Sequence, residues 1–438
     1  MEHRRCSAIK SDTSAVCPEA LTWLFLLQIA AAQEGVKVMR APTTTTADFN
    51  FEDLDLAWLQ RKSSIKWRRA KGDVLPAWMA DMDFPVAEPI SVAISELVQR
   101  GDLGYPAWSN WMGHSPLAEP FTRRMTELYG WQPRPDWVRN FSDLIQAIQV
   151  VIYLTTQPGD AVALHTPTYP PILKSITMMG RQVITSQMER SGDDWGFDPG
   201  RLERDIAEAG CRTLIVVNPH NPTGHVYTAT ELRILADIAV RHDLLVIADE
   251  IFAELAFPPH RHIPLASLGP DIADRTVTLT SATKAFNFAG LRCAVAHVGA
   301  ARLRAALDAC PPDLLGVLDV MGVAATKAAW EQGDAWLAAV VDHLKANRDF
   351  IAGTLVAQAP AIGYHPPQAT YLAWLDCRQL ETATEPAAFF EEKARVLILP
   401  GEGFGPGGVG FARLNFATSR EILTEILARM TSAVGGQS

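Results

Sequence analysis

The stretch SATKAFNFAGLR, residues 281–292, places one lysine, Lys284, between a hydroxyl residue, Ser281, and an arginine, Arg292. A primary amine that loses its proton can form a Schiff base with an aldehyde, and burial beside polar or cationic groups favours that loss. A hydroxyl and a guanidinium suit a phosphate dianion, because arginine offers a planar fork of donors. The stretch therefore indicates pyridoxal phosphate, although a lysine in such a loop is more often a solvated surface charge.

The overall composition is that of an ordinary globular protein. Of the 438 residues, 48% are hydrophobic and 20% are charged, and this length favours about two domains. Lysine and arginine number 39 against 49 aspartate and glutamate residues, which gives a net charge of −10. Because nucleic-acid binding needs a concentrated basic surface, we expect no nucleic-acid partner.

The six cysteines are scattered, with no C-x-x-C pair and no neighbouring histidine at metal-ligand spacing. We therefore expect no metal site and a reducing, cytoplasmic location. Cys293 directly follows Arg292, which makes it a candidate nucleophile. The favoured interpretation of Cys293 is a small buried hydrophobic residue.

Residues 1–45 differ from the rest of the chain. A 13-residue apolar run, Ala20–Ala32, follows a basic N-terminus. It has the dimensions of a signal peptide and is too short to span a bilayer comfortably. The acidic Asp12 and Glu19 count against a signal peptide, and Met39 offers an alternative start of translation. We predict an N-terminal extension without a catalytic role, and no association with a membrane.

Apolar strands separated by helical patterns make up the middle of the chain. Helices are expected at 88–100 and 117–129, where apolar residues recur at helical spacing and a glycine follows. The strands that are apolar throughout are 161–164, 213–217, 244–248 and 276–279. They indicate an α/β fold with a mostly parallel sheet that helices cover on both faces. Ligands bind such sheets beyond the carboxyl ends of the strands.

The order of these patterns divides the rest of the chain into three parts. We expect an N-terminal arm with part of a small domain at 46–95, a large domain at 96–325, and a C-terminal small domain at 326–438. Proline and aspartate break regular structure between Leu75 and Pro85, which predicts an extended arm. The small domain is expected to be α+β, with one long helix and three strands at 334–356, 371–375, 396–399 and 411–416.

Polar side chains follow several of the apolar strands. Asp249 ends one strand, where burying an unpaired carboxylate is costly. A protonated pyridine nitrogen is a suitable partner and makes the ring an electron sink, while a helix N-cap is the alternative. Asn221 lies in a proline-rich turn, either as a donor to a phenolic oxygen or as a simple turn former. Tyr169 is a candidate to stack on the ring, and otherwise a core aromatic.

Phosphate and carboxylate groups have their own candidate ligands. Helix N-termini bind phosphate, and a helix is expected to begin near Ser142, Asp143 and Leu144. Arg413 is the only charged residue in the apolar strand 411–416. It suits bidentate binding of a substrate α-carboxylate, and a structural salt bridge is the alternative.

Four motifs in this order resemble one known group of proteins. They are NPHNPTG at 218–224, ADE at 248–250, SATKAFNFAGLR at 281–292 and FARLNF at 411–416. Together they resemble the fold-type I pyridoxal-phosphate enzymes of the aminotransferase class I/II superfamily. The resemblance covers roughly residues 48 to 432.

The resemblance implies a role for each matching residue. Lys284 is the implied Schiff-base lysine and general base, Asp249 lies on the ring nitrogen, and Tyr169 stacks on the ring. The other implied contacts are Asn221 with the phenolic oxygen, Ser281 and Arg292 with the phosphate, and Arg413 with the substrate carboxylate. Tyr105 corresponds to a tyrosine that usually reaches the phosphate of the neighbouring subunit, which implies a homodimer with a shared active site.

Within the superfamily, the chain looks most like the MalY/PatB-type cystathionine β-lyases. The similarity lies in Lys66-Trp67-Arg68, in Trp78–Phe84 and in the motif that contains Asn221. We expect Asp81, inside the second of these segments, and Asn221 to contact substrate. The implied reaction is β-elimination on cystathionine or another cysteine S-conjugate, which yields a thiol, pyruvate and ammonia.

Two departures from the family pattern leave other outcomes open. Phe252 stands where relatives usually carry tyrosine or histidine, and residues 140–143 lack the usual small, neutral pattern. The alternatives are an aminotransferase, a decarboxylation-coupled oxidative deaminase, and a non-catalytic regulatory protein that binds the same cofactor.

Overall fold

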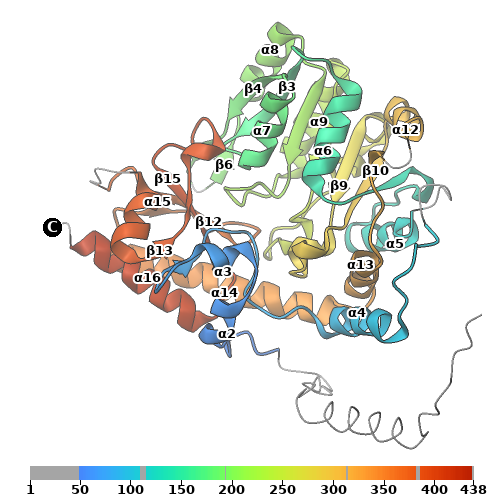
Figure 1. Ribbon diagram of the computed structural model, residues 1–438. Helices are drawn as coiled ribbons and strands as arrows, with labels where there is room; N and C mark the ends of the chain where they lie inside the picture. Colours follow the sequence, from blue (N-terminus) through green and yellow to red (C-terminus); the bar gives the residue numbers. More distant parts are fainter. Residues whose placement is uncertain (1–48, 109–114, 193, 312–313, 381–384, 437–438) are drawn as a thin grey trace, which may run out of the picture. The chain divides into compact units, whose positions relative to one another are not determined.

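A seven-stranded sheet forms the centre of the fold (Figure 1). The computed structural model describes residues 49–108, 115–192, 194–311, 314–380 and 385–436, so the predicted extension at 1–45 lies outside them. The strands, in spatial order, are β2 (Val138–Phe141), β10 (Ala294–Val298), β9 (Thr276–Thr280), β8 (Leu245–Asp249), β7 (Thr213–Val217), β3 (Ala161–Thr166) and β4 (Gln182–Gln187).

The predicted parallel character of this sheet is confirmed. Strands β4, β3, β7, β8 and β9 pair in parallel, whereas β10 is antiparallel to both of its neighbours, β9 and β2. Strands β2 and β10 were not predicted from the sequence. Residues 140–141, which lack the small, neutral pattern usual in the family, belong to β2.

Helices cover both faces of the sheet, as the apolar strands predicted. On one face lie α6 (Leu144–Thr155), α7 (Pro170–Met178) and α12 (Ala301–Asp308). On the other lie α8 (Pro199–Ala209) and α9 (Ala229–Arg241). Ile215 of β7 packs toward the first set and Leu214 toward the second. Because both faces are buried, successive residues of each strand are apolar rather than alternating.

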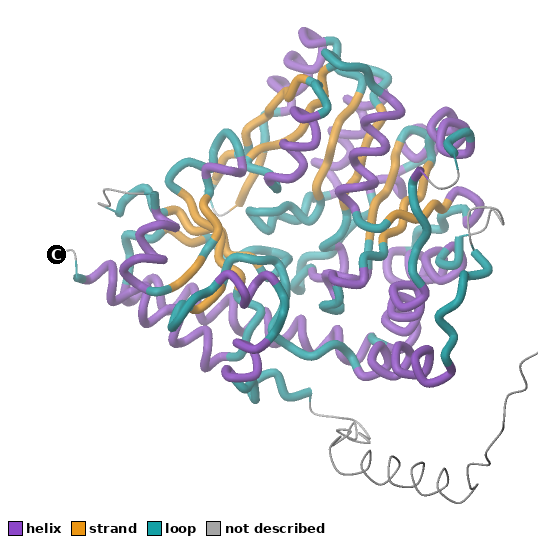
Figure 2. Tube along the Cα trace, viewed as in Figure 1, coloured by secondary structure: helices purple, strands orange, loops and turns teal. Residues whose placement is uncertain are grey.

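A second, antiparallel sheet of four strands lies apart from the first (Figure 2). Its order is β11 (Gly363–Tyr364), β12 (Leu372–Asp376), β15 (Phe411–Asn415) and β14 (Leu399–Pro400). The long helix α14 (Asp334–Gln358) and the helix α16 (Arg420–Gly435) pack together and share the apolar core of this sheet. These elements match the α+β pattern expected near the C-terminus, while the predicted boundaries at residues 95 and 325 remain predictions.

The arm before α4 (Glu88–Arg100) is clamped by two asparagines. Nδ2 of Asn287 donates to the carbonyl oxygens of Met82 and Phe84 at 3.1 and 2.7 Å, and its Oδ1 accepts from the Met82 N–H at 2.9 Å. Asn415 donates to the carbonyl of Asp81 at 2.7 Å. Asn287 has a φ of +61°, a left-handed conformation that asparagine tolerates better than most residues. The clamp therefore fixes the arm beside the lysine stretch.

The remaining elements complete the frame around these sheets. Strand β1 (Leu75–Pro76) pairs in parallel with β13 (Val396–Leu397), and α4 and α5 (Ala118–Tyr129) pack on α13 (Val320–Gln332). The short elements are α2 (Leu56–Arg61), α3 (Ile65–Arg69), β5 (Glu189–Ser191), β6 (Asp194–Gly196), α10 (Pro270–Ala273), α11 (Ala282–Ala285) and α15 (Pro386–Phe389). Among the described residues, no helix combines the length and the apolar character needed to cross a membrane.

Candidate active site

A cavity of about 790 Å³ opens at the carboxyl ends of β7, β8 and β9. This is the edge of the sheet where ligands bind in α/β folds. The structure brings ten of the predicted site residues into its walls: Ser142, Asp143, Leu144, Tyr169, Asn221, Asp249, Ser281, Lys284, Arg292 and Arg413. Asp81 and Tyr105 are not among the residues that line it.

Lys284 projects its amine toward the arm. Its Nζ atom donates a hydrogen bond of 2.7 Å to the carbonyl oxygen of Ala80 and lies 3.6 Å from Oδ1 of Asp81. Burial lowers the pKa of Lys284, although the nearby Asp81 carboxylate opposes the change. A lower pKa makes the neutral, nucleophilic amine more accessible, as Schiff-base formation requires.

Asp249 is a buried carboxylate at the end of β8. Its Oδ1 atom accepts from the Ile251 N–H at 3.2 Å, and among the described residues no cationic side chain pairs with it. Burial raises the pKa of Asp249 to about 7, and the neighbouring Glu250 charge adds to this effect. The next helical turn, Ala253–Leu255, begins after Phe252, so the N-cap alternative does not apply. The carboxylate suits a cation delivered by a bound ring.

Arg413 and Asn221 form a polar pair in the opposite wall. Nη1 of Arg413 donates to Oδ1 of Asn221 at 3.0 Å, and Nη2 donates to the Trp78 carbonyl at 3.1 Å. Its Nε is buried and has no hydrogen-bond partner among the described residues. No carboxylate of these residues forms an ion pair with Arg413, so they do not provide the structural salt bridge that was the alternative. Burial lowers the pKa of Arg413 to about 10, so it remains a cation at neutral pH.

The N-terminus of α6 and Arg292 meet at another end of the cavity. Asp143 is the N-cap of α6 and accepts from the Gln146 N–H at 2.8 Å. Nη2 of Arg292 lies 2.5 Å from Oδ2 of Asp143. A guanidinium beside a helix N-terminus is a suitable setting for phosphate. The Asp143 carboxylate carries a negative charge at the same place, which opposes phosphate binding.

Ser281 is the N-cap of α11. Its hydroxyl accepts from the Thr283 N–H at 3.1 Å and donates to the Cys293 carbonyl at 2.6 Å. The hydroxyl predicted to bind phosphate is thus also a structural cap. Cys293 itself is buried, and burial raises its pKa to about 11, which fits the interpretation as a hydrophobic residue.

The two predicted tyrosines lie in different environments. Tyr169 directly precedes α7 and lines the cavity, and burial raises its pKa. Tyr105 is 99% exposed. Its predicted reach into a neighbouring subunit stays a prediction.

Sequence reasoning missed two groups that support the lysine. The hydroxyl of Tyr371 donates to the same Ala80 carbonyl that Lys284 contacts, at 2.9 Å. Tyr371 also packs edge-on against Phe252, with ring centroids 5.7 Å apart. A backbone carbonyl has no sequence signature. The Ala80 carbonyl becomes recognisable as a partner of Lys284 only once the structure places the arm beside it.

These groups fit pyridoxal phosphate. The buried carboxylate without a cation, the amine with a lowered pKa, and the guanidinium with an unsatisfied Nε all line one cavity. Each has the charge or hydrogen-bonding capacity that one part of the cofactor or of an amino-acid substrate requires.

The chain belongs to the aminotransferase class I and II family, whose sequence profile matches residues 112–430. It is a pyridoxal-phosphate-dependent enzyme with the fold of that family. The cystathionine β-lyase of Corynebacterium glutamicum is 32% identical to it, over 87% of this chain and 99% of that protein.

The solved structures with this fold include the following two. The crystal structure of OvoB has a TM-score of 0.82 and 34% identity, with 88% of this chain and 98% of that chain covered. The PLP-bound C-S lyase of Staphylococcus hominis has a TM-score of 0.82 and 26% identity, with 89% and 99% covered.

Proposed function

We propose that this protein is a pyridoxal-phosphate-dependent carbon–sulfur lyase. Its reaction is β-elimination on cystathionine or another cysteine S-conjugate, which yields a thiol, pyruvate and ammonia. The observation that supports it most is the common cavity of Lys284, Asp249 and Arg413. Relatives named cystathionine β-lyase and C-S lyase support the choice of reaction.

Three side chains carry the proposed chemistry. When bound, the cofactor supplies an electron sink for a carbanion at Cα. Arg413 binds the substrate α-carboxylate through two N–H groups, which fixes Cα relative to Lys284. The Lys284 amine removes the proton from Cα as general base, an effectively intramolecular step. The Asp249 carboxylate would hold a proton on the ring nitrogen of the bound cofactor.

The elimination itself breaks two bonds of the substrate. The electron pair of the Cα–H bond forms a Cα–Cβ double bond, and the pair of the Cβ–S bond leaves with sulfur as a thiolate. The released enamine hydrolyses in water to pyruvate and ammonia. We assign Asp81 and Asn221 to substrate contacts, because Asp81 lies beside the Lys284 amine and Asn221 beside the Arg413 guanidinium.

The remaining residues are assigned to the cofactor. Arg292, Ser281 and the α6 N-terminus at Ser142, Asp143 and Leu144 bind the phosphate. Tyr169 would stack on the ring, and Asn221 would contact its phenolic oxygen. The lining of one cavity by all of these groups supports the assignment.

The test is product analysis with cofactor-loaded protein. Cystathionine and a panel of S-substituted cysteines are incubated with it, and pyruvate and free thiol are measured. The proposal expects both products in equal amounts, and their absence with every conjugate contradicts it. Lys284→Ala serves as the inactive control.

Transamination is the second candidate, which Phe252 leaves open. This residue lines the cavity and packs on Tyr371, so it offers no polar contact where one is usual in the family. A different fate of the same Cα carbanion is then possible. Formation of a new amino acid from an added 2-oxo acid, without release of thiol, is the result that selects transamination.

We also infer a cytoplasmic homodimer with a shared active site. The nearly full exposure of Tyr105 leaves its side chain accessible to a second copy of the chain. Light scattering gives the mass in solution. Tyr105→Phe is expected to weaken cofactor binding in the dimer, and a monomer with full activity contradicts the inference.

A further inference from the structure

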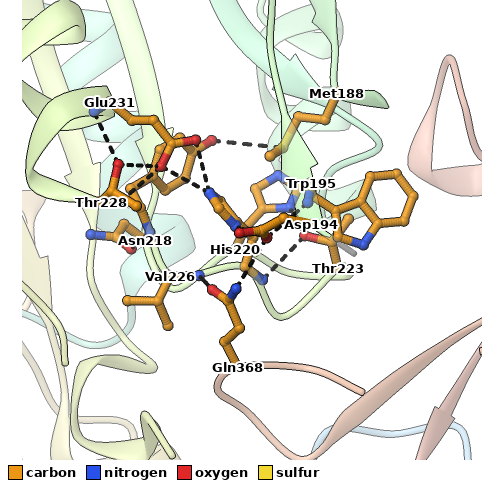
Figure 3. Close-up of polar contacts among 12 residues, drawn as sticks. Met188, Asp194, Trp195, Asn218, His220, Thr223, Val226, Thr228, Glu231 and Gln368 are labelled. Carbon is orange, nitrogen blue, oxygen red and sulfur yellow. Dashed lines mark hydrogen bonds and ion pairs between the residues drawn. The ribbon is translucent and has the colours of Figure 1, made fainter. Parts of the chain in front are cut away.

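A tight turn carries Asn221 to the cavity. The Gly224 N–H donates to the His220 carbonyl at 2.7 Å, and the His220 N–H donates to the His225 carbonyl at 2.8 Å. Nδ1 of His220 lies 2.8 Å from the Thr223 hydroxyl. Figure 3 shows His220 and Thr223 of the turn among the polar side chains that surround it. These hydrogen bonds join the two ends of the segment 220–225. The position of His225 at one end therefore constrains the position of Asn221 within the turn.

His225 lies between two carboxylates. Its Nδ1 is 3.0 Å from Oδ1 of Asp194, and its Nε2 is 3.1 and 3.2 Å from the two carboxylate oxygens of Glu231. Both ring nitrogens face acceptors, so both donate and the ring is an imidazolium. The side chain is 1% exposed. Burial disfavours the charge, but hydrogen bonds to Asp194 and Glu231 outweigh burial and raise the pKa of His225 to about 9.

The two carboxylates come from separate elements. Asp194 begins β6, and Glu231 lies in the first turn of α9, where it forms a capping box with Thr228. The cation therefore ties a hairpin and a helix N-terminus to the end of the turn. Removing it leaves two negative charges around a buried gap.

Gln368 extends the contact to the segment before β12. Its Nε2 donates to Oδ1 of Asp194 at 3.0 Å, and its Oε1 accepts from the Val226 N–H at 2.9 Å. The N–H groups of Gln368 and Ala369 both donate to the Gly224 carbonyl at 3.0 Å. A Cβ added at Gly224 would lie 2.2 Å from Cβ of Pro367. The turn therefore packs directly against the segment 367–369 that leads into β12.

We propose that His225 is a positioning residue, whose cation, held between Asp194 and Glu231, fixes the 220–225 turn and so the amide of Asn221 in the cavity. This inference rests on the proposed contact of Asn221 with the cofactor. His220, the other buried histidine of the turn, is a weaker candidate for this role. Among the described residues, its Nε2 has no hydrogen-bond partner and contacts neither carboxylate.

The test compares His225→Gln with His225→Arg in cofactor-loaded protein. Glutamine fills the site without charge, whereas arginine keeps a cation that can reach Asp194, whose side chain is 48% exposed. Asn221 is proposed to contact the phenolic oxygen of the cofactor. Displacing its amide is therefore expected to change the proton affinity of the nitrogen through which Lys284 is attached to the cofactor. For the glutamine variant we expect the pH midpoint of the cofactor absorption band to move by about half a unit, roughly threefold in the ionisation constant. We also expect kcat to fall about tenfold, with KM little changed.

The arginine variant is expected to restore both quantities to within about twofold of the natural protein. His297→Gln is the matched control, because His297 is also buried, accepts a hydrogen bond of 3.2 Å from the Arg134 N–H, and does not line the cavity. It is expected to lower stability without moving the midpoint. Should His225→Gln fail to fold, Asp194→Asn gives the same measurement, because it neutralises one carboxylate at constant size.

An unchanged midpoint and kcat in His225→Gln, or in Asp194→Asn where that variant replaces it, overturns the inference. So does equal damage in the glutamine and arginine variants, because the site then needs the imidazole shape rather than its charge. The absorption band is read without turnover. If the natural protein releases no thiol, the proposed lyase function fails while the midpoint shift still tests His225.

Discussion

The amine of Lys284 hydrogen-bonds to the carbonyl oxygen of Ala80, 204 positions earlier in the chain, at 2.7 Å. The Tyr371 hydroxyl shares that oxygen at 2.9 Å. The arm therefore supplies an acceptor that orients the amine, and the asparagine clamp at Asn287 keeps the acceptor in place. Any variant that frees the arm is expected to disturb the lysine as well.

Replacing Lys284 by alanine removes the proposed general base. We expect pyruvate release to fall by roughly 10⁴-fold, the upper range for a positioned acid or base. The cofactor is expected to become removable by dialysis, because its covalent attachment is lost. The control is Lys174→Ala, an exposed lysine of α7, which is expected to keep full activity. Retention of most activity in Lys284→Ala contradicts the assignment.

Asp249 predicts a pH-dependent stability in the cofactor-free protein. Its pKa is about 7 in the folded chain against an ordinary value of 3.8, so between these values the folded state holds a proton that the unfolded state has lost. Stability therefore falls as pH rises toward 7 and then levels off. Relative to Asp249→Asn, the natural protein is expected to lose on the order of 2–3 kcal/mol between pH 5 and 8.

Urea unfolding of both proteins at the two pH values measures this difference. An equal gap between them at pH 5 and 8 contradicts the raised pKa. With cofactor bound, a cation beside the carboxylate is expected to abolish the effect, because the ionised form of Asp249 is then paired.

Arg413 is expected to control substrate affinity. Its guanidinium is already aligned by Asn221 and Trp78, and its Nε is unsatisfied among the described residues. Lysine keeps the charge but loses the planar fork. Arg413→Lys is expected to lower kcat/KM about 10²-fold, mainly through KM, in steady-state assays. Arg378→Lys, an exposed arginine paired with Asp376, is the control, and an unchanged KM in Arg413→Lys argues against carboxylate binding.

The sequence predicts the elements that obey local rules. The helix at 88–100 has its predicted bounds, because apolar spacing and the glycine that follows define both ends. The parallel strands were found for a similar reason, since their residues are apolar on both faces. Strand β10 was missed, although Ala294–Val298 is equally buried. It pairs with β9, the preceding strand, and with β2, which lies near residue 140, and composition does not reveal the second pairing.

The candidate site divides in the same way. Side chains with distinctive chemistry at strand ends, such as Asp249 and Arg413, were found because few other residues serve there. The Ala80 carbonyl and the His225 cation were missed, because their roles come from tertiary contacts rather than residue type. Asp143 was predicted as a phosphate ligand, but it is also an N-cap and an ion-pair partner of Arg292. Sequence alone does not rank these uses.

The buried pair of Lys66 and Asp83 predicts how strongly the arm is held. Nζ of Lys66 lies 2.9 Å from Oδ1 of Asp83 and donates to the Asp81 carbonyl at 3.1 Å, with both side chains at most 3% exposed. Asp83→Leu leaves a buried cation without its partner. We expect a loss of about 3–5 kcal/mol in the free energy of unfolding, measured in urea.

The matched control is the double variant Lys66→Met with Asp83→Leu. Removing both charges avoids the unpaired cation, so the double variant is expected to recover most of the loss. The indole of Trp67 donates to Asp83 at 2.8 Å and loses this acceptor in both variants. Its contribution to the free energy of unfolding therefore cancels when the two are compared. If Asp83→Leu costs less than about 1 kcal/mol, solvent reaches Lys66 and the pair does not anchor the arm. If the double variant is as unstable as the single one, the shape of the pair rather than its charge holds Ala80 beside Lys284.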